Sequence, residues 1–181
     1  FIVAEQLRNI KIKASSILLE PSSKNTAPAI TTAVLKGLEL YENPCFLVLP
    51  SDHLIKNVDK FNEVISAAIN YCDLGKLVTF GINPTKAEAG YGYIEAEQNL
   101  SNKYLKAQKI IKFIEKPEKK IAEKLFLNKR FSWNSGIFLF NGSTFIKEIK
   151  KYSPSIYKYC KDSVENSNLD LDFQRLDKRS F

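Results

Sequence analysis

One apolar run, together with the residues that end it, constrains this 181-residue chain most. The run Cys45-Phe46-Leu47-Val48-Leu49 has the length and composition of a buried strand, and helical patterns lie on either side of it. Pro50 ends the strand because it has no backbone N–H to donate to a sheet. This alternation of strands and helices predicts an α/β fold with a mainly parallel mixed sheet, flanked by helices and joined by right-handed crossovers.

Asp52 follows this strand, at the end where open α/β sheets bind ligands. A carboxylate there could hold Mg²⁺ against a phosphate, because Mg²⁺ takes one or two carboxylates and leaves room for phosphate oxygens. A solvated aspartate in a turn is the common alternative. His53 is the only histidine of the chain, and beside Asp52 it is more typical of a structural hydrogen-bonding residue than of a general base.

Apolar spacing elsewhere predicts further helices and strands. Apolar residues at helical intervals predict helices over about 26–41, 58–73, 118–127 and 143–151, and another from 154 onward. Short apolar runs predict strands over 17–19, 76–82, 91–97, 109–115 and 137–140. Residues 1–7 are typical of the end of a helix, and the polar segment 163–172 predicts a mobile loop.

Composition and charge limit the class of protein. Hydrophobic residues make up 44% and charged residues 26% of the chain, which is ordinary for a globular protein. No apolar stretch is as long as a membrane span. The net charge of +7 comes mainly from lysines spread along the chain, with only four arginines. Because arginine is the usual reader of bases and phosphates, we expect no nucleic-acid partner. The lack of an apolar stretch of membrane-spanning length leads us to expect no membrane partner.

The cysteines and the start of the chain suggest compartment and extent. Cys45 and Cys72 lie in apolar patterns typical of small core residues, and with Cys160 they show no zinc-ligand spacing. A cytoplasmic protein is therefore expected. The chain begins with Phe1 and contains no methionine. We expect residues 1–181 to be the central part of a single domain that is truncated at both ends.

Two segments could approach a ligand through their backbone. Segment 20–29 leads into the predicted helix at 26–41, and an anion or a base could bind at that helix N-terminus. A plain capped helix is the alternative. The run Gly90-Tyr91-Gly92 could let the backbone come close to a sugar, or it could form a bulge where a strand begins.

Two further segments carry polar side chains that suit a sugar phosphate. Glu115 could accept hydrogen bonds from sugar hydroxyls while Lys116 faces a phosphate, but adjacent strand residues point to opposite faces. Only a bend would let both meet one ligand, and Pro117 can supply it. Asn134 offers both a donor and an acceptor, although a core Trp133 followed by a turn is the alternative.

Six motifs occur in a characteristic order along the chain. They are Glu20-Pro21-x-x-Lys24-Asn25-Thr26-Ala27-Pro28, Leu49-Pro50-Ser51-Asp52-His53, Thr79-Phe80-Gly81-Ile82, Gly90-Tyr91-Gly92-Tyr93-Ile94, Phe113-x-Glu115-Lys116-Pro117 and Trp133-Asn134-Ser135-Gly136. This series closely resembles the mannose-1-phosphate guanylyltransferases (GDP-mannose pyrophosphorylases), in the bacterial type that is often fused to a mannose-6-phosphate isomerase domain. The resemblance covers nearly the whole chain.

The resemblance implies a Rossmann-like (GT-A-like) nucleotidyltransferase domain. Its implied reaction converts GTP and α-mannose 1-phosphate to GDP-mannose and pyrophosphate, with Mg²⁺ as cofactor, for polysaccharide biosynthesis. By this likeness Asp52 is the metal ligand and a catalytic residue, and Lys116 is the catalytic residue that meets the sugar phosphate. The implied nucleotide-binding residues are Glu20, Pro21, Asn25, Thr26, Pro50 and Ser51. The implied sugar-binding residues are Gly92, Tyr93, Glu115, Asn134 and Ser135.

The chain also departs from the family pattern. The Gly-rich signature loop is expected before Phe1 and a second metal-binding aspartate after Phe181, so we expect residues 1–181 alone to be inactive. Lys24 stands where many members have arginine, and Ala89 where threonine is usual. A nucleotidyltransferase for another sugar 1-phosphate, a non-catalytic regulatory domain that binds a nucleotide sugar, and a basic nucleic-acid binder are the alternatives. A homo-oligomer is compatible with the sequence.

Overall fold

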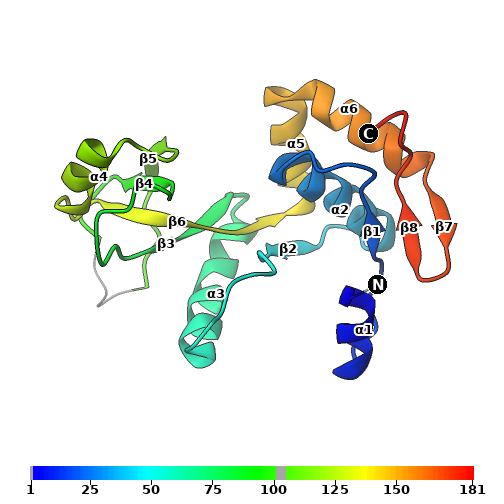
Figure 1. The fold of residues 1–181 in the computed structure, drawn as a ribbon, viewed down its shortest axis with the longest axis horizontal. Coiled ribbons are helices and arrows are strands. Elements are labelled where there is room, and N and C mark those ends of the chain that lie inside the picture. The colour runs from blue at the N-terminus through cyan, green and yellow to red at the C-terminus, as the bar shows by residue number, and fades with distance from the viewer. Residues whose placement is uncertain (1, 101–104) are drawn as a thin grey trace. The chain divides into compact units, whose positions relative to one another are not determined.

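The computed structural model describes residues 2–100 and 105–181, and the chain within it forms two compact units. Unit one combines Phe1–Pro44 with Gly142–Phe181, and unit two is the continuous stretch Cys45–Asn141. Figure 1 shows the elements of both.

Unit two is built on a five-stranded sheet with two helices. The strands are β2 (Cys45–Val48), β3 (Val78–Ile82), β4 (Tyr93–Ala96), β5 (Ile110–Ile114) and β6 (Phe131–Asn141), and the helices are α3 (Val58–Asp73) and α4 (Lys119–Phe126). The strand order is β2-β6-β4-β5, with β3 paired to β6 as well. Strand β6 is therefore the centre of the sheet, because three other strands pair with it.

The α/β class is confirmed, but the expected parallel pairing is wrong for this sheet. Every strand pair described in it is antiparallel. Phe138 of β6 pairs with Val48 of β2 and also with Thr79 of β3, so these two strands flank β6. Since both run antiparallel to β6, they are parallel to each other. The β2–α3–β3 unit was thus anticipated correctly, but a later strand lies between its two strands.

Strand β6 is longer than its apolar pattern predicts. The apolar pattern predicts a strand over 137–140, and a core Trp133 followed by a turn is one alternative for the residues before it. In the structure these residues lie inside β6. Gly136 has a left-handed backbone conformation (φ 70°), which residues with a side chain rarely adopt. The register against β3 shifts between Thr79 and Gly81, which marks a β-bulge at this level of the strand pair.

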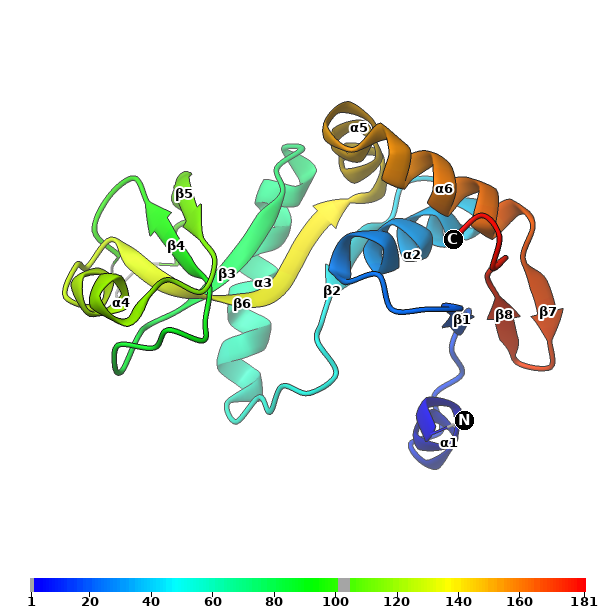
Figure 2. The ribbon, with the colours of Figure 1, turned by 45° about the horizontal axis from the view of Figure 1, so that its top comes forward.

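Apolar residues pack on both faces of the sheet of unit two. One cluster joins the strands to α4 and consists of Tyr93, Ala122, Leu125, Phe131 and Trp133. A second joins α3 to the strands and contains Ala68, Cys72 and Leu139. Figure 2 shows α3 beside β3 and β6. Helix α3 has the predicted bounds, and the side chain of Asn57 caps it by accepting a hydrogen bond from the Lys60 N–H.

Unit one consists mainly of helices with a small sheet. Its elements are α1 (Ile2–Asn9), β1 (Leu18–Leu19), α2 (Thr26–Leu40), α5 (Gly142–Tyr152), α6 (Pro154–Glu165), β7 (Asn168–Asp170) and β8 (Phe173–Arg175). Helix α2 packs against α5 and α6, and β8 pairs in parallel with β1 and antiparallel with β7.

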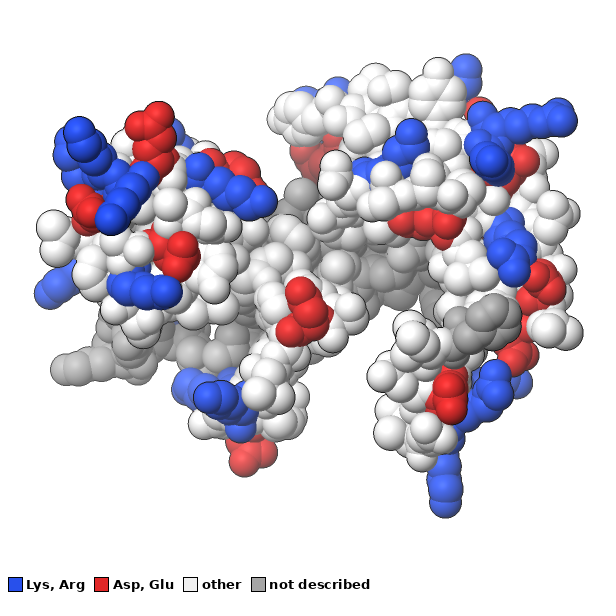
Figure 3. Space-filling model, in the orientation of Figure 1, with Lys and Arg blue, Asp and Glu red and all other residues white. Residues whose placement is uncertain are grey.

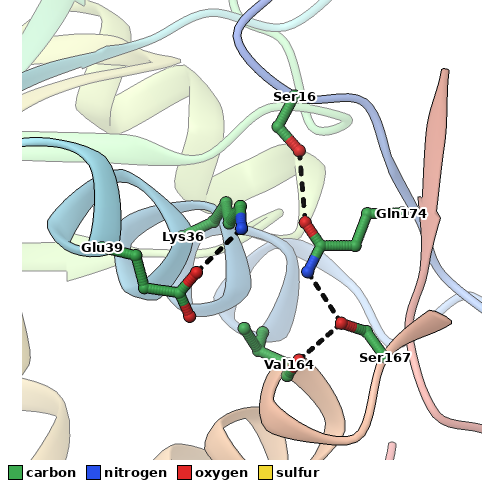
Figure 4. Close-up of polar contacts among 6 residues, drawn as sticks. All are labelled: Ser16, Lys36, Glu39, Val164, Ser167 and Gln174. Atoms are coloured by element: carbon green, nitrogen blue, oxygen red, sulfur yellow. Dashed lines mark hydrogen bonds and ion pairs between the residues drawn. The ribbon is translucent and has the colours of Figure 1, made fainter. Parts of the chain in front are cut away.

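The loop expected over 163–172 is not observed. The segment contains the end of α6 and strand β7, which forms a hairpin with β8. Figure 4 shows how Gln174 connects this hairpin to other parts of unit one. Its Nε2 donates to the Ser167 Oγ at 2.7 Å, and its Oε1 accepts from the Ser16 Oγ at 3.4 Å. Gln174 therefore ties the hairpin both to Ser167, at its own start, and to Ser16, which is distant in sequence.

Candidate functional site

Three of the predicted sugar-binding residues converge at Gly92. A Cβ atom placed on Gly92 would lie 2.9 Å from Glu115 Oε2, 3.0 Å from Phe113 Cζ and 3.6 Å from Asn134 Cβ. The Asn134 N–H also donates to the Gly92 carbonyl oxygen at 2.8 Å. A side chain at this position would therefore have to displace the Glu115 carboxylate and crowd the Phe113 ring. We call Gly92, Glu115 and Asn134 the Gly92 cluster.

The Asn134 side chain is oriented by two neighbours. Its Oδ1 accepts a hydrogen bond from Gly136 N at 3.3 Å and from Thr79 Oγ1 at 3.2 Å. Because a backbone N–H can only donate, Gly136 identifies the atom facing it as oxygen and turns the amide NH₂ away. Thr79 Oγ1 is also 3.0 Å from the Ile137 carbonyl oxygen, which ties it to the bulge of β6.

The Gly92 cluster thus offers a donor and an acceptor beside a glycine. Within the described residues, no hydrogen bond engages the Asn134 NH₂ group, and the Glu115 carboxylate is exposed. A carboxylate only accepts hydrogen bonds and an NH₂ group only donates them. Two neighbouring hydroxyls of a sugar could satisfy both at once, one as donor and one as acceptor.

Lys116 follows the cluster in a strained conformation. Its φ is 40°, in the left-handed region that non-glycine residues rarely adopt. This bend comes directly after Glu115, so the two side chains are not held on opposite faces as in a regular strand. The expected bend exists, but Lys116 itself makes it rather than Pro117. Strain of this kind is often found at functional sites.

Glu88 is a residue of this site that sequence reasoning missed. Its Oε1 accepts a hydrogen bond from the Gly90 N–H at 3.2 Å, and its Oε2 pairs with Lys86 Nζ at 3.0 Å. The hydrogen bond from Lys86, followed by that from Gly90, lowers the pKa of the Glu88 carboxyl. The Glu88 N–H in turn donates to the Tyr93 hydroxyl at 3.0 Å. Glu88 therefore shapes the turn that leads to Gly92.

Two predicted sugar-binding residues have buried side chains. Tyr93 is completely buried, and Ser135 is 6% exposed with its Oγ accepting from the Ile137 N–H at 3.1 Å. The structure thus leaves no accessible surface of Tyr93 to a ligand. Trp133 is also a core residue, and its Nε1–H has no hydrogen-bond partner among the described residues. The half-exposed Tyr91 packs its ring edge-on against Trp133.

Asp52 lies in an exposed turn of unit two. Within the described residues, no hydrogen bond and no ion pair engages its carboxylate. Two residues earlier, the Pro50 Cγ is 3.5 Å from the position of a Cβ on Gly136, whose N–H bonds Asn134. Pro50 therefore lies close to one of the residues that orient Asn134. Ser51 lies between Pro50 and Asp52 and is exposed.

The donor set around Asp52 fits a metal that is held mainly by its substrate. In the described part of the chain, no three His, Cys, Asp or Glu side chains are grouped to hold a metal ion. Mg²⁺ is commonly bound through one or two carboxylates together with phosphate oxygens of a ligand. A single unengaged carboxylate is compatible with that mode and not with an all-protein cage.

The remaining predicted nucleotide-binding residues lie in unit one. Glu20, Pro21, Asn25 and Thr26 are all exposed, and Thr26 is the first residue of α2. Asn25 precedes the helix with φ 65° and ψ −168°, and its side chain makes no capping hydrogen bond. Its amide is therefore not consumed by the helix. Partial burial raises the pKa of the Glu20 carboxyl.

Surface charge and helix length concern nucleic acids and membranes, the two classes of partner that we do not expect from the sequence. On the face in Figure 3, lysine and arginine side chains are interspersed with carboxylates, over the elements of both units. None of the helices in the described ranges combines the length and apolarity that a bilayer crossing requires.

Comparison with known proteins gives a consistent result. A family model described as nucleotidyl transferase matches residues 1–178. A mannose-1-phosphate guanylyltransferase of Escherichia coli is 44% identical, and the alignment covers 100% of this chain and 40% of that protein. The xanthan biosynthesis protein XanB of Xanthomonas campestris is 42% identical, with 100% of this chain and 38% of that protein covered. The chain thus spans about 40% of the length of these relatives.

Two solved structures have similar folds. A structure described as mannose-6-phosphate isomerase from Helicobacter pylori superposes with a TM-score of 0.83 and 34% identity, covering 99% of this chain and 68% of that one. A structure described as mannose-1-phosphate geranyltransferase from Thermus thermophilus gives a TM-score of 0.74 and 26% identity, covering 90% and 46% of the two chains. These neighbours agree with a Rossmann-like nucleotidyltransferase fold.

Proposed function

This chain belongs to the nucleotidyl transferase family, and from that premise we propose that the protein containing it transfers GMP from GTP to α-mannose 1-phosphate. The products would be GDP-mannose and pyrophosphate. The names of the most similar relatives support this reaction. The observation that carries the proposal is the convergence of Gly92, Glu115 and Asn134 from three separate segments on one point.

The Gly92 cluster would bind the mannose. Glu115 accepts hydrogen bonds from its hydroxyls, and Asn134 donates to a neighbouring oxygen through the NH₂ group that Thr79 and Gly136 turn outward. Gly92 leaves the space in which the Glu115 carboxylate lies. Lys116, on the bend after Glu115, would meet the phosphate of the sugar with its ammonium group.

The phosphate oxygen of mannose 1-phosphate is already anionic, so the attack on the α-phosphorus of GTP needs no general base. The chain must instead align the two substrates and neutralise their charge. Nucleotidyl transferases of this family generally use a divalent metal. We propose Mg²⁺ held by the Asp52 carboxylate. When bound, it would supply positive charge against the nucleotide phosphates.

On the nucleotide side, we propose that residues around the start of α2 meet the guanine nucleotide. In unit one the proposed nucleotide-binding residues are Glu20, Pro21, Asn25 and Thr26. In unit two, considered by itself, the family resemblance proposes Pro50 and Ser51 in the turn before Asp52. The uncapped N-terminus of α2 leaves backbone N–H groups for an acceptor, and the Asn25 side chain is not used by the helix.

We further propose that the protein is cytoplasmic, that it supplies an activated sugar for polysaccharide synthesis, and that residues 1–181 are the central part of one nucleotidyltransferase domain. Residues 1–181 alone would then show little or no turnover. GTP and mannose 1-phosphate are the proposed small-molecule partners. A homo-oligomer of the protein could carry out the same reaction.

A substrate panel tests the proposed reaction. The intact protein is incubated with each of the four nucleoside triphosphates and with the 1-phosphates of mannose, glucose and galactose, with and without Mg²⁺. We expect the pair GTP and mannose 1-phosphate to give the fastest pyrophosphate release, and only with a divalent metal. Faster turnover with another pair would replace the proposed specificity. Tight binding of GDP-mannose without any turnover would show a regulatory binding domain instead.

A further inference from the structure

Two cysteine side chains of unit two lie in direct contact. Cys45 is the first residue of β2 and Cys72 lies in the last turn of α3, and their sulfur atoms are 2.8 Å apart. A disulfide requires about 2.05 Å between the sulfurs. A side-chain movement of under an ångström would therefore bring the two thiols to bonding distance.

The surroundings hold the two cysteines in this position. Cys45 pairs with Asn141 across β2 and β6. The Cys72 Sγ donates to the Asn141 Oδ1 at 3.3 Å, and the Asn141 Nδ2 donates to the Cys72 carbonyl oxygen at 3.0 Å. The same asparagine thus fixes the strand that carries one thiol and the helix end that carries the other.

The two thiols differ in accessibility, which assigns them different parts in an oxidation. Cys45 is exposed whereas Cys72 is completely buried. This corrects the expectation that both are core residues, since only Cys72 is. Burial, with a further contribution from the hydrogen bond to Cys45, raises the pKa of the Cys72 thiol to about 12. An oxidant in solution therefore meets Cys45 first, and Cys72 is still a thiol when Cys45 is oxidised.

We propose that Cys45 and Cys72 form a reversible disulfide when the protein meets a peroxide. The Cys45 sulfur attacks one peroxide oxygen, the O–O bond breaks, and Cys45 becomes a sulfenic acid with release of water. The Cys72 sulfur then attacks the Cys45 sulfur, the S–OH bond breaks, and the proton of the Cys72 thiol passes to the departing hydroxyl group, which leaves as a second water. In total two thiols and one hydrogen peroxide give one disulfide and two waters. A dithiol reverses the reaction by exchange.

The bridge would close a segment that contains Asp52. Residues 46–71 lie between the two cysteines and include most of β2, the turn with Asp52 and nearly all of α3. A cross-link between the ends of this segment reduces the conformational freedom of the unfolded chain, and the native contact already exists. Oxidation is therefore expected to stabilise unit two. This inference does not depend on the proposed transferase activity.

Cys160 provides an internal control. It lies in α6 of unit one and is 3% exposed, and its thiol donates to the Pro28 carbonyl oxygen at 3.8 Å. It shares burial with Cys72 but has no thiol beside it among the described residues. A variant at this position should leave the proposed disulfide unchanged.

The experiment is a titration of the folded protein with hydrogen peroxide, followed by alkylation under denaturing conditions and peptide mass spectrometry. We expect one cross-linked pair of peptides, containing Cys45 and Cys72, with the mass of two hydrogen atoms lost. Dithiothreitol should restore both thiols. Cys160→Ser should form the same cross-link, whereas Cys45→Ser should form none and should leave Cys72 alkylatable after denaturation.

Two results would overturn the proposal. One is alkylation of both Cys45 and Cys72 after peroxide at a dose that fully modifies a free surface thiol. The other is a cross-link that joins Cys160 to either of them. Thermal unfolding checks the closure of the segment separately: the Tm should rise on oxidation in Cys160→Ser and not in Cys45→Ser. A bridge that forms without raising the Tm would refute the stabilising effect.

Discussion

The Gly92 cluster of unit two and the segment Glu20–Thr26 of unit one differ in how far their own fold prepares them for a ligand. In the first, a backbone hydrogen bond joins Asn134 to Gly92, the Asn134 amide is oriented by its neighbours, and Glu115 lies close to Gly92. In the second, the residues are exposed and Asn25 makes no capping hydrogen bond. The sugar side is thus organised before binding, whereas the nucleotide side would gain its contacts on binding.

Asp52 belongs to unit two, but like the segment Glu20–Thr26 it is exposed. Replacing it should have the largest effect on turnover. Asp52→Asn keeps the size of the side chain but removes the charge that would hold the metal. We expect kcat of the intact protein to fall by roughly 100- to 1000-fold, as for the loss of other groups that stabilise developing charge. Asp73→Asn, at the exposed end of α3, is the matched control. Initial rates at saturating GTP and mannose 1-phosphate measure both, and near-normal turnover of Asp52→Asn would remove Asp52 from the mechanism.

Gly92→Ala tests whether the sugar side is prepared by steric fit. The new Cβ would lie 2.9 Å from Glu115 Oε2, so Glu115 must move. We expect the KM for mannose 1-phosphate to rise by about 10- to 100-fold, because small displacements of positioned groups are costly. Gly90→Ala is the control, since its Cβ would meet only Glu88 Oε1 at an ordinary 3.5 Å. Equal effects of the two substitutions would contradict a specific role of Gly92.

Thr79 tests whether the amide of Asn134 is oriented before binding. Thr79→Val preserves the shape but removes the hydroxyl that contacts Asn134 and Ile137. Loss of one hydrogen bond of about 1 kcal/mol predicts a roughly fivefold weaker affinity for mannose 1-phosphate. Thr79→Ser should restore most of the affinity. Calorimetry with mannose 1-phosphate measures the effect, and a kcat decrease without any change in sugar affinity would argue against this role.

Asn25 offers the opposite test in unit one. Asn25→Gly removes the side chain but suits the φ of 65°, so we expect no loss of Tm. The affinity for GTP should nevertheless fall by about fivefold if the amide meets the nucleotide. Titration of the intact protein with GTP and a thermal scan measure the two quantities. A lower Tm with unchanged GTP affinity would show that Asn25 serves the helix and not the ligand.

The smallest effect concerns Glu88 and pH. Its folded pKa lies below the ordinary 4.5, because Lys86 and the Gly90 N–H stabilise the carboxylate. The contribution of this carboxylate to stability is therefore complete above that ordinary value and disappears as pH falls through the lower folded pKa. The affinity for mannose 1-phosphate should decrease over the same window, because the turn before Gly92 loosens. In Glu88→Gln this part of the pH dependence should be absent, which titrations across that window can check.

The local parts of this fold could be predicted from sequence. Helix α3 has its predicted bounds because its apolar spacing and the Asn57 cap are local signals. Strand β6 was only partly found, because the left-handed Gly136 resembles a turn and only pairing with β3 and β4 keeps it in a strand. The antiparallel sheet was missed for the same reason, since no local pattern shows that β6 lies between β2 and β3.

The site shows the same division between local and distant information. Glu115 and Asn134 were chosen by their chemistry, yet the sequence could not show that they meet at Gly92. Tyr93 illustrates the reverse error: its place in a glycine-rich motif indicated a ligand contact, whereas its side chain lies in the core. The roles of Thr79 and Glu88 depend on their hydrogen bonds with Asn134 and Gly90, which no sequence pattern indicates.

Strand β6 has a consequence for how this family can change in evolution. It pairs with β2, β3 and β4 along one continuous stretch. Within this stretch, Trp133 lies on one face of the sheet and Asn134 on the opposite face. Inserting or deleting one residue at its start would exchange these faces, exposing the tryptophan and burying the amide. Length variation among homologues should therefore accumulate in the turns around the sheet, while β6 keeps a constant length.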